Sequence, residues 1–191
     1  SLALNITQPQ WSFGGGTVLM FRHSHRYSND IDIFVPDPQY LAYITPKLSD
    51  RVAAMTTDYL EEHNSLKLRF AEGEIDFVAS ESLTDDPTVI LKLFGRDVAT
   101  ETSGEIIAKK IWHRGDRITA RDIFDLAMVL ELEPEALHSI RPILRARRGE
   151  VLARIAAQEA TLRESFDALD VLGYRRTFDE CSTLVTQALE R

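Results

Sequence analysis

Apolar and polar side chains alternate over several short stretches in the first hundred residues. The segment "SLKLRFAEGEIDFVAS" (65–80) alternates on both sides of a polar turn at 72–74, which predicts a β-hairpin. The segment "TVILKLFG" (88–95) predicts a further strand, and "DVAT" (97–100) predicts a short one. Strand and turn are also expected before Pro36. This part of the chain therefore predicts a β-sheet.

Helical spacing interrupts these strands twice. A first helix is expected to begin at Thr17. Between Pro38 and Met55 the apolar residues recur at helical intervals, which predicts an amphipathic helix with a kink or a break at Pro46. The residues that set this spacing are Leu41, Ile44, Leu48, Val52 and Met55.

Helical periodicity dominates after residue 100. The segment that starts with Ser103 has the composition of a helix N-terminus. A long amphipathic helix is predicted from Glu150 to Leu172, and the residues on its packing face are Val151, Ile155, Leu162 and Phe166. Helix ends are expected at Gly115, Pro134, Pro142, Gly149 and Gly173.

Together these patterns predict an α+β fold, in which a mixed β-sheet with flanking helices is followed by a C-terminal helical bundle. We expect a sheet-containing unit at residues 1–100 and a helical unit at residues 101–191. The length of 191 residues fits one compact domain or two small ones. The chain contains no internal repeat.

The composition is that of an ordinary globular protein, with 44% apolar and 27% charged residues. No run approaches the roughly 18 apolar residues of a membrane-spanning helix, so we expect no membrane partner. The single cysteine, Cys181, excludes an internal disulfide, and no signal-peptide pattern opens the sequence, so a cytoplasmic location is expected. Because the sequence begins with Ser1 rather than methionine, we expect native residues to precede it.

The net charge of −8 argues against bulk attraction to nucleic acid. Positive charge is nevertheless concentrated late in the chain, where the arginines are Arg141, Arg145, Arg147, Arg148 and Arg154. This cluster predicts either a solvated helix face or a phosphate-binding surface.

Two aspartates, Asp30 and Asp32, share one face of a predicted strand. Alternate strand residues project to the same side about 6.6–6.8 Å apart, so Ile31 and Ile33 are expected to point into the core. Two carboxylates held in this way repel each other unless a cation lies between them. Their spacing suits Mg²⁺, which takes one or two carboxylates and completes its shell with water and phosphate oxygens. The alternative is that both aspartates line the solvent side of an edge strand.

Gly15, Gly16 and Thr17 precede these aspartates and lead into a predicted helix. A turn without side chains lets backbone N–H groups and a helix N-terminus approach an anion closely. A glycine-rich turn is weak on its own. Followed by a pair of carboxylates of the kind that bind magnesium, it predicts a site for a phosphate substrate with its metal.

The run Gly15-Gly16-Thr17, followed after a gap by Asp30-Ile31-Asp32, resembles the signature of the polymerase-beta-like nucleotidyltransferase superfamily. The segment "RYSNDIDIF" (26–34) narrows the resemblance to the AbiEii/AbiGii toxin family, nucleotidyltransferase-like proteins of bacterial type IV toxin–antitoxin and abortive-infection systems. Gly14 departs from the pattern, because the superfamily usually has an apolar residue there. The resemblance implies a nucleotidyltransferase-like sheet.

A second block, "AKKIWHRGDRITARDIFDL" (108–126), is similar to the lysine, arginine and aspartate elements of the family. The resemblance implies that Lys110 offsets triphosphate charge and that Asp122 is catalytic. Asp125 lies three residues later on the same helix face, where it could meet a nucleotide. Lys109 cannot face the same way as Lys110 and is expected to be solvated. The alternative for the two aspartates is a surface ion-pair ladder.

The resemblance also implies site residues outside these two blocks. Arg26 and Ser28 would hold the triphosphate together with the glycine turn. A third acid is common on a neighbouring strand, where it aligns the acceptor hydroxyl or acts as its base. Asp76 has the right kind of position, and Glu74 competes with it. These acids can meet the first pair only if the two strands lie close together.

We therefore expect an enzyme that transfers a nucleoside monophosphate from an NTP to an acceptor hydroxyl with Mg²⁺ or Mn²⁺, in a cleft that the helical unit completes. As a toxin it would act on RNA, such as a transfer RNA end, or on a protein, and it could have a cognate antitoxin. One alternative is a small-molecule acceptor, as in antibiotic-modifying enzymes. Another is a non-catalytic interaction module, for which the acids and Lys110 would lie more than about 10 Å apart.

Overall fold

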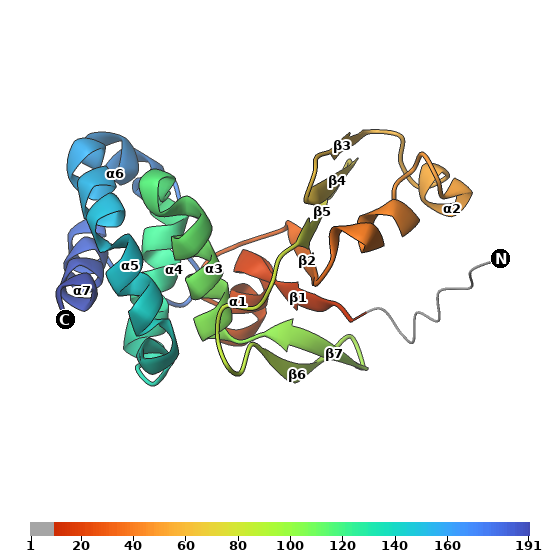
Figure 1. The fold of residues 1–191 in the computed structure, drawn as a ribbon. Coiled ribbons are helices and arrows are strands. Elements are labelled where there is room, and N and C mark those ends of the chain that lie inside the picture. Colours follow the sequence, from red (N-terminus) through yellow and green to blue (C-terminus); the bar gives the residue numbers. More distant parts are fainter. Residues whose placement is uncertain (1–9) are drawn as a thin grey trace.

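A seven-stranded mixed sheet lies at the centre of the computed structural model, which describes residues 10–191 (Figure 1). Its strands are β1 (Ser12–Gly14), β2 (Ile31–Val35), β3 (Tyr59–Glu61), β4 (Ser65–Phe70), β5 (Gly73–Ala79), β6 (Thr88–Leu93) and β7 (Arg96–Glu101). They are ordered β3-β4-β5-β2-β1-β7-β6. β1 runs parallel to β7, and β2 runs parallel to β5, whereas the other neighbours are antiparallel.

Most helices lie together on one side of this sheet, at the left of Figure 1. The α-helices are α1 (Gly15–His23), α2 (Asp50–Ala53), α3 (Ser103–Arg114), α4 (Ala120–Leu132), α5 (Ala136–Ala157), α6 (Glu159–Asp167) and α7 (Phe178–Glu190). Two 3₁₀ helices, η1 (Pro38–Tyr43) and η2 (Gly115–Arg117), connect other elements. Within residues 10–191, no helix is long and apolar enough to cross a membrane.

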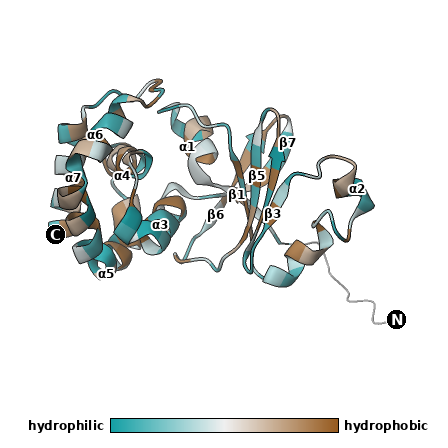
Figure 2. Cartoon of the chain, turned by 90° about the horizontal axis from the view of Figure 1, so that it is seen from above, coloured by the Kyte–Doolittle hydropathy of each residue, from teal (hydrophilic) through white to brown (hydrophobic). Residues whose placement is uncertain are grey.

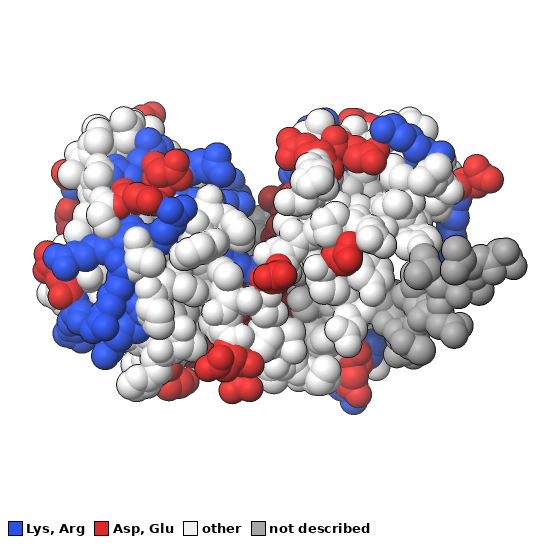
Figure 3. Space-filling model, in the orientation of Figure 1, with Lys and Arg blue, Asp and Glu red and all other residues white. Residues whose placement is uncertain are grey.

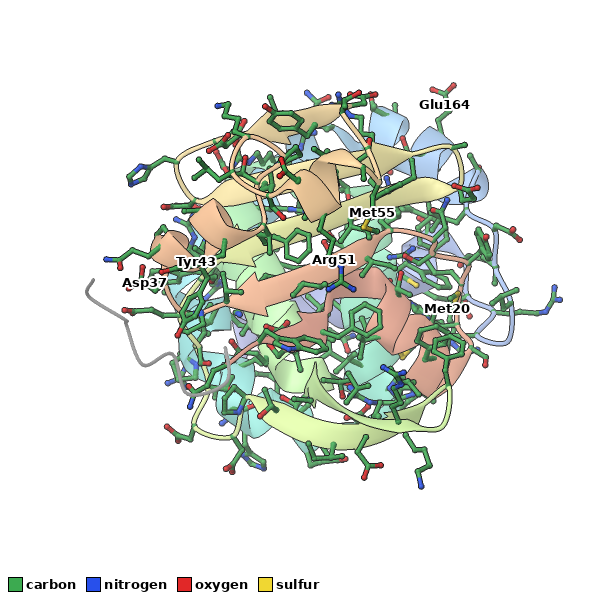
Figure 4. The ribbon with its side chains drawn as sticks, turned by 90° about the vertical axis from the view of Figure 1, so that its right-hand side faces the viewer. Met20, Asp37, Tyr43, Arg51, Met55 and Glu164 are labelled. Atoms are coloured by element: carbon green, nitrogen blue, oxygen red, sulfur yellow. The ribbon has the colours of Figure 1, made fainter. Side chains whose placement is uncertain are left out.

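Two apolar clusters form the core of the fold. The larger one joins α1 to helices α3–α7 and includes Phe13 of β1. The smaller one joins Val35, Leu66 and Leu68 of the sheet to Leu41 of η1. Figure 2 shows the sheet on edge, with the helical bundle on one side and α2 on the other. Figure 4 looks onto the α2 side, where the segment that carries Tyr43, Arg51 and Met55 lies in front of the strands.

Polar caps fix where the helices next to the sheet begin. The Thr102 hydroxyl accepts a hydrogen bond from the backbone N–H of Glu105 at the start of α3. At the start of α4, Thr119 and Asp122 each accept the other's backbone N–H and form a capping box. The position of Asp122 is therefore set by the local sequence as well as by packing.

The α+β class is confirmed by this architecture. The hairpin predicted at 65–80 is formed by β4 and β5, and Phe70 pairs with Gly73 beside its turn. The strands predicted at 88–95 and 97–100 form a second hairpin, β6 and β7. Sequence reasoning missed β3, because three residues are too few to show alternation. The division near residue 100 stays a prediction, since α1 packs into the same core as the later helices.

The helix start predicted at Thr17 is wrong, because α1 begins at Gly15. Gly15 has φ +70°, a conformation that a side chain would strain, so glycine is favoured at this position. The break predicted at Pro46 within residues 38–55 is confirmed. This segment forms η1 and the short α2, separated by turns, since Pro46 cannot donate the backbone hydrogen bond that a continuous helix needs there.

The predicted ends at Pro142 and Gly149 are also wrong, because both residues lie inside α5. Its buried side chains, which include Ile140, Ile143 and Leu144, hold the helix together across the proline. The long helix predicted from 150 to 172 is divided at Gln158, where α5 ends and α6 follows. Its expected packing face is confirmed, since Val151, Ile155, Leu162 and Phe166 are all buried.

The expectation that Ile31 and Ile33 point into the core is wrong. Ile31 is 37% exposed, and both side chains line an apolar groove with Phe21, Tyr27 and Phe94. The alternation along β2 itself holds, because the polar residues lie on the opposite face. The face that carries the aspartates is therefore the one turned toward the helical bundle.

Candidate active site

A cavity of about 450 Å³ lies between the sheet and helices α3 and α4. Figure 3 shows the deep notch between the helical lobe and the lobe that carries β3–β5. The cavity is lined from the sheet side by Asp30, Asp32 and Asp76, and from the helix side by Lys109 and Lys110. Residues far apart in the sequence thus meet in one place.

Strand pairing brings the three predicted acids together. Asp30 lies immediately before β2, Asp32 lies on β2, and Asp76 lies on β5. In the parallel pairing of β2 with β5, Asp32 is directly opposite Asp76. Glu74, the competing candidate, also lines the cavity, two residues before Asp76 on the same face of β5.

The charge of Asp32 has no close partner. Burial raises the pKa of its carboxyl above the usual value, and although the charges of Lys110 and Arg114 lower it, those of Asp76 and Asp30 raise it further. Within residues 10–191, no side chain donates a hydrogen bond to the carboxylate of Asp30 or Asp32. A bound cation would remove this repulsion.

The three glycines let other side chains approach the backbone closely. A Cβ atom on Gly14 would collide with Glu101 and Phe34, and one on Gly15 would collide with Asp32. On Gly16 it would lie 2.8 Å from the guanidinium of Arg26. The space next to each glycine is thus occupied by a side chain that lines the cavity. The sequence predicted that a phosphate would use this space and did not predict these side chains.

The N-terminus of α1 has no side-chain cap. Gly14 is its N-cap residue, and no side chain bonds to the first turn. Gly15, Gly16 and Ser28 line the cavity. Thr17 does not line it, because its hydroxyl donates to the carbonyl of Asp30 and holds the aspartate loop against the helix.

Arg26 is held by Asp125 on the far side of the aspartate loop. Its guanidinium donates to both carboxylate oxygens of Asp125, at 2.7 and 2.8 Å, and His25 Nε2 lies 2.9 Å from the same carboxylate. Burial alone would raise the pKa of Asp125, but Lys110, His25 and Arg26 hold it far below its usual value. Arg26 lines the cavity, whereas Asp125 is fully buried and does not.

Lys110 connects this buried pair to the cavity. Its Nζ atom lies 2.7 Å from Asp122 and 3.2 Å from Asp125. Burial would lower the pKa of Lys110, but these two aspartates raise it above its usual value, so the lysine stays charged. Both oxygens of Asp122 are engaged, one by Lys110 and the other by Thr119. The surface ion-pair ladder considered from the sequence is therefore a buried network.

The family model of the AbiEii nucleotidyl transferase toxin of type IV toxin–antitoxin systems matches residues 2–190. The chain belongs to the AbiEii family. This membership confirms the resemblance drawn from the two motif blocks, and it makes the chain a nucleotidyltransferase. No match was found among curated proteins.

Three solved structures share the fold of this AbiEii-family chain. JHP933 from Helicobacter pylori is 16% identical with a TM-score of 0.60, covering 96% of this chain and 83% of that one. A putative nucleotidyltransferase from H. pylori is 15% identical with a TM-score of 0.59, covering 96% and 86%. The MenT4 nucleotidyltransferase toxin of Mycobacterium tuberculosis is 16% identical with a TM-score of 0.53, covering 98% and 76%. At these identities the likeness shows the fold alone.

The site residues of the AbiEii-family chain fit a divalent cation. Asp30 and Asp32 offer unpaired carboxylates on one face, and Mg²⁺ needs only one or two carboxylates besides water and phosphate oxygens. Residues 10–191 contain no ready-made group of three or more acidic, histidine or cysteine ligands. The donor set therefore suits a metal that arrives with a phosphate substrate better than a permanently caged one.

Sequence reasoning missed two bases and one acid of the cavity. Lys67 on β4 lies opposite Asp76 in the antiparallel pairing, its Nζ is 2.9 Å from the Asp76 carboxylate, and it also contacts Glu74. Alternation in the hairpin, which puts Lys67 and Asp76 on one face, was a signal that could have found it. The expectation that Lys109 is solvated is wrong, because it is buried and its Nζ lies 2.6 Å from Glu101. Burial raises the pKa of Glu101 to about 7.

Proposed function

We propose that this AbiEii-family chain transfers a nucleoside monophosphate from an NTP to a hydroxyl group of RNA, with Mg²⁺ or Mn²⁺ as the metal. The observation that carries the proposal is the meeting of Asp30, Asp32 and Lys110 with the N-terminus of α1 in one cavity. Lys110 and the two aspartates line the same cavity, so one substrate can contact them together. A non-catalytic module would not need this arrangement.

Each of these groups has a part in binding the nucleotide. Asp30 and Asp32 would hold the metal, which supplies positive charge against the phosphates. The N–H groups at the start of α1, with Ser28 beside them, bind the triphosphate. Lys110 offsets the charge that develops on the leaving pyrophosphate. The acceptor oxygen attacks the α-phosphorus, and the bond from that phosphorus to pyrophosphate breaks.

Exposed arginines at the mouth of the cavity support an RNA acceptor. Arg114 and Arg121 line the cavity from α3 and α4, and Arg117 lies between them in the sequence. Figure 3 shows Lys and Arg side chains gathered on the helical lobe. Arginines in this position attract a polyanion even though the whole chain is acidic. The type IV family suggests, in addition, that an antitoxin partner opposes this activity.

Incubation with each labelled NTP, Mg²⁺ and total cellular RNA tests the proposal, with Asp30→Ala as the inactive partner. We expect label on RNA with the wild-type chain, and a rate lower by about 10³-fold or more with Asp30→Ala, because several kcal/mol of charge stabilisation is lost. Equal transfer by both chains would contradict the site assignment. A parallel reaction with small-molecule acceptors would show whether these are used instead of RNA.

A further inference from the structure

Glu101 is a buried acid of the cavity that has no part in the nucleotide binding proposed above. It ends β7, is 1% exposed, and lines the cavity together with the three aspartates. Its Oε1 atom accepts a hydrogen bond from Lys109 at 2.6 Å. Its Oε2 atom is buried and has no hydrogen-bond partner within residues 10–191. A buried carboxylate oxygen left without a partner is costly, which points to a ligand that supplies one.

A second cavity, of about 520 Å³, adjoins the first one, and Glu101 lines the first cavity but not the second. The two cavities share the lining residues Phe34 and Lys109. Lys109 Nζ lies 4.0 Å from the centre of the Phe34 ring, so these side chains form the common wall. Phe34 comes from β2 and Lys109 from α3, which follows directly after β7 (Figure 1).

The three glycines at the start of α1 show in which order the side chains lie along the first cavity. Arg26 and Ser28 lie beside Gly16, and Asp32 lies beside Gly15. Glu101 and Phe34 lie beside Gly14. Along the wall of the first cavity, the basic end with Arg26 would bind phosphate and the middle with Asp32 would bind the metal. The acidic end with Glu101 adjoins the second cavity.

In-line transfer requires the attacking and leaving oxygens on opposite sides of the α-phosphorus. If pyrophosphate leaves toward the basic end, the acceptor must approach from the acidic end. We propose that the acceptor RNA approaches through the second cavity and that Glu101 Oε2 accepts the proton of its attacking hydroxyl. As the new phosphorus–oxygen bond forms, this proton passes to Glu101 and pyrophosphate departs. This inference rests on the nucleotidyl transfer proposed above.

The other acids of the cavity are less suited to this role. Both oxygens of Asp122 are engaged, and Asp76 is paired with Lys67 beside the metal-binding aspartates. Lys109 keeps Glu101 in place, and it is itself held by Glu105 at 3.5 Å. Glu105 does not line the cavity, because its carboxylate accepts backbone N–H groups of Leu83 and Thr84.

Two pairs of variants test the inference, with total cellular RNA as acceptor. Glu101→Gln keeps the hydrogen bond to Lys109 but cannot take a proton, so kcat should fall by about 10²- to 10⁴-fold. Glu164→Gln makes the same change on an exposed residue of α6, away from the cavity, and as the matched control it should transfer at the wild-type rate. Thr88→Trp fills the second cavity and should raise the KM for RNA by about tenfold or more. Val89→Trp, on the neighbouring residue outside that cavity, should leave this KM unchanged.

Binding of a non-hydrolysable α,β-methylene NTP with Mg²⁺, measured by calorimetry, separates chemistry from folding. We expect all four variants to bind this analogue within about threefold of the wild type. The inference is overturned if Glu101→Gln and Thr88→Trp transfer label as the wild type does. If the wild-type chain itself transfers no label to RNA, the proposed function fails, and the inference fails with it.

Discussion

The two ends of the cavity differ in how fully their charges are paired. At the paired end, formed by Arg26, Lys110, Asp122 and Asp125, every charged group has an opposite charge at hydrogen-bond distance. At the open end, formed by Asp30, Asp32 and Glu101, the carboxylates lack partners or keep a bare oxygen. The pKa of Asp125 is lowered, whereas the pKa values of Asp32 and Glu101 are raised.

This difference distinguishes charged residues that stabilise the fold from charged residues that bind a substrate. A buried ion pair with both partners present adds little to stability, but removing one partner destabilises the protein strongly. Carboxylates that repel each other cost stability until a ligand neutralises them, which is the pattern expected of functional groups. We therefore expect substitutions at the paired end to weaken the fold, and substitutions at the open end to strengthen it while they abolish activity.

The largest effect is expected at Asp125. Asp125→Asn leaves Arg26, Lys110 and His25 around a neutral amide, and breaking a buried ion pair costs about 3–5 kcal/mol. Urea denaturation measures this loss as a lower midpoint at unchanged slope. Asp32→Asn is the matched control and should leave stability unchanged or increase it. A greater loss of stability in Asp32→Asn than in Asp125→Asn would contradict the assignment of these residues to the open and paired ends.

The next effect is the pH dependence that Glu101 contributes. Its pKa is raised to about 7 from 4.5, so the folded state keeps a proton that the unfolded state releases. This contribution to stability is complete below pH 4.5 and is lost as the pH rises through 7. Glu101→Gln, which has no charge to bury, should therefore be more stable than the wild type at pH 8, by about 1–3 kcal/mol, and similar to it at pH 4.5.

Thermal or urea unfolding of both chains at the two pH values measures this difference. Other titrating groups cancel, because both chains share them. If Glu101→Gln is less stable at pH 8, the ion pair with Lys109 outweighs the cost of burial, and Glu101 belongs to the paired end. A variant that gains stability and loses transfer would mark Glu101 as functional rather than structural.

The charged residues of the cavity also differ in how well the sequence predicts them. Asp30 and Asp32 were found because a strand shows its faces in its own alternation. That Asp76 lies opposite Asp32 depends on the parallel pairing of β2 with β5, which no local pattern specifies. Glu101 and Lys109 were missed for the same reason, because their partner atoms come from separate elements.

The fold follows the same division. The β4–β5 hairpin and the N-terminus of α3 were predicted because turn residues and caps act locally. The helix that passes through Pro142 and Gly149 was not, since its buried side chains override the local preference for a break. Sequence thus predicts the elements well, and the pairing of charges between them poorly.

A smaller effect is expected from adding a methyl group at Gly14. Its Cβ would meet the Glu101 carboxylate and the Phe34 ring, so Gly14→Ala should displace both and cost about 1–3 kcal/mol. The measurements are the urea midpoint and the rate of label transfer, and both should fall. An unchanged rate would show that Glu101 can move without affecting the reaction.

The smallest effect is expected at Gly149, which serves as the control for Gly14. No atom lies within 4 Å of the position that its Cβ would take, and the residue lies in the interior of α5, far in sequence from the cavity. Gly149→Ala should therefore stabilise the chain by about 0.5–1 kcal/mol, because alanine loses less backbone entropy than glycine in a helix. Transfer should be unchanged. The opposite signs of two glycine-to-alanine changes would show that Gly14 is required for close packing at the open end, whereas Gly149 leaves room for a side chain.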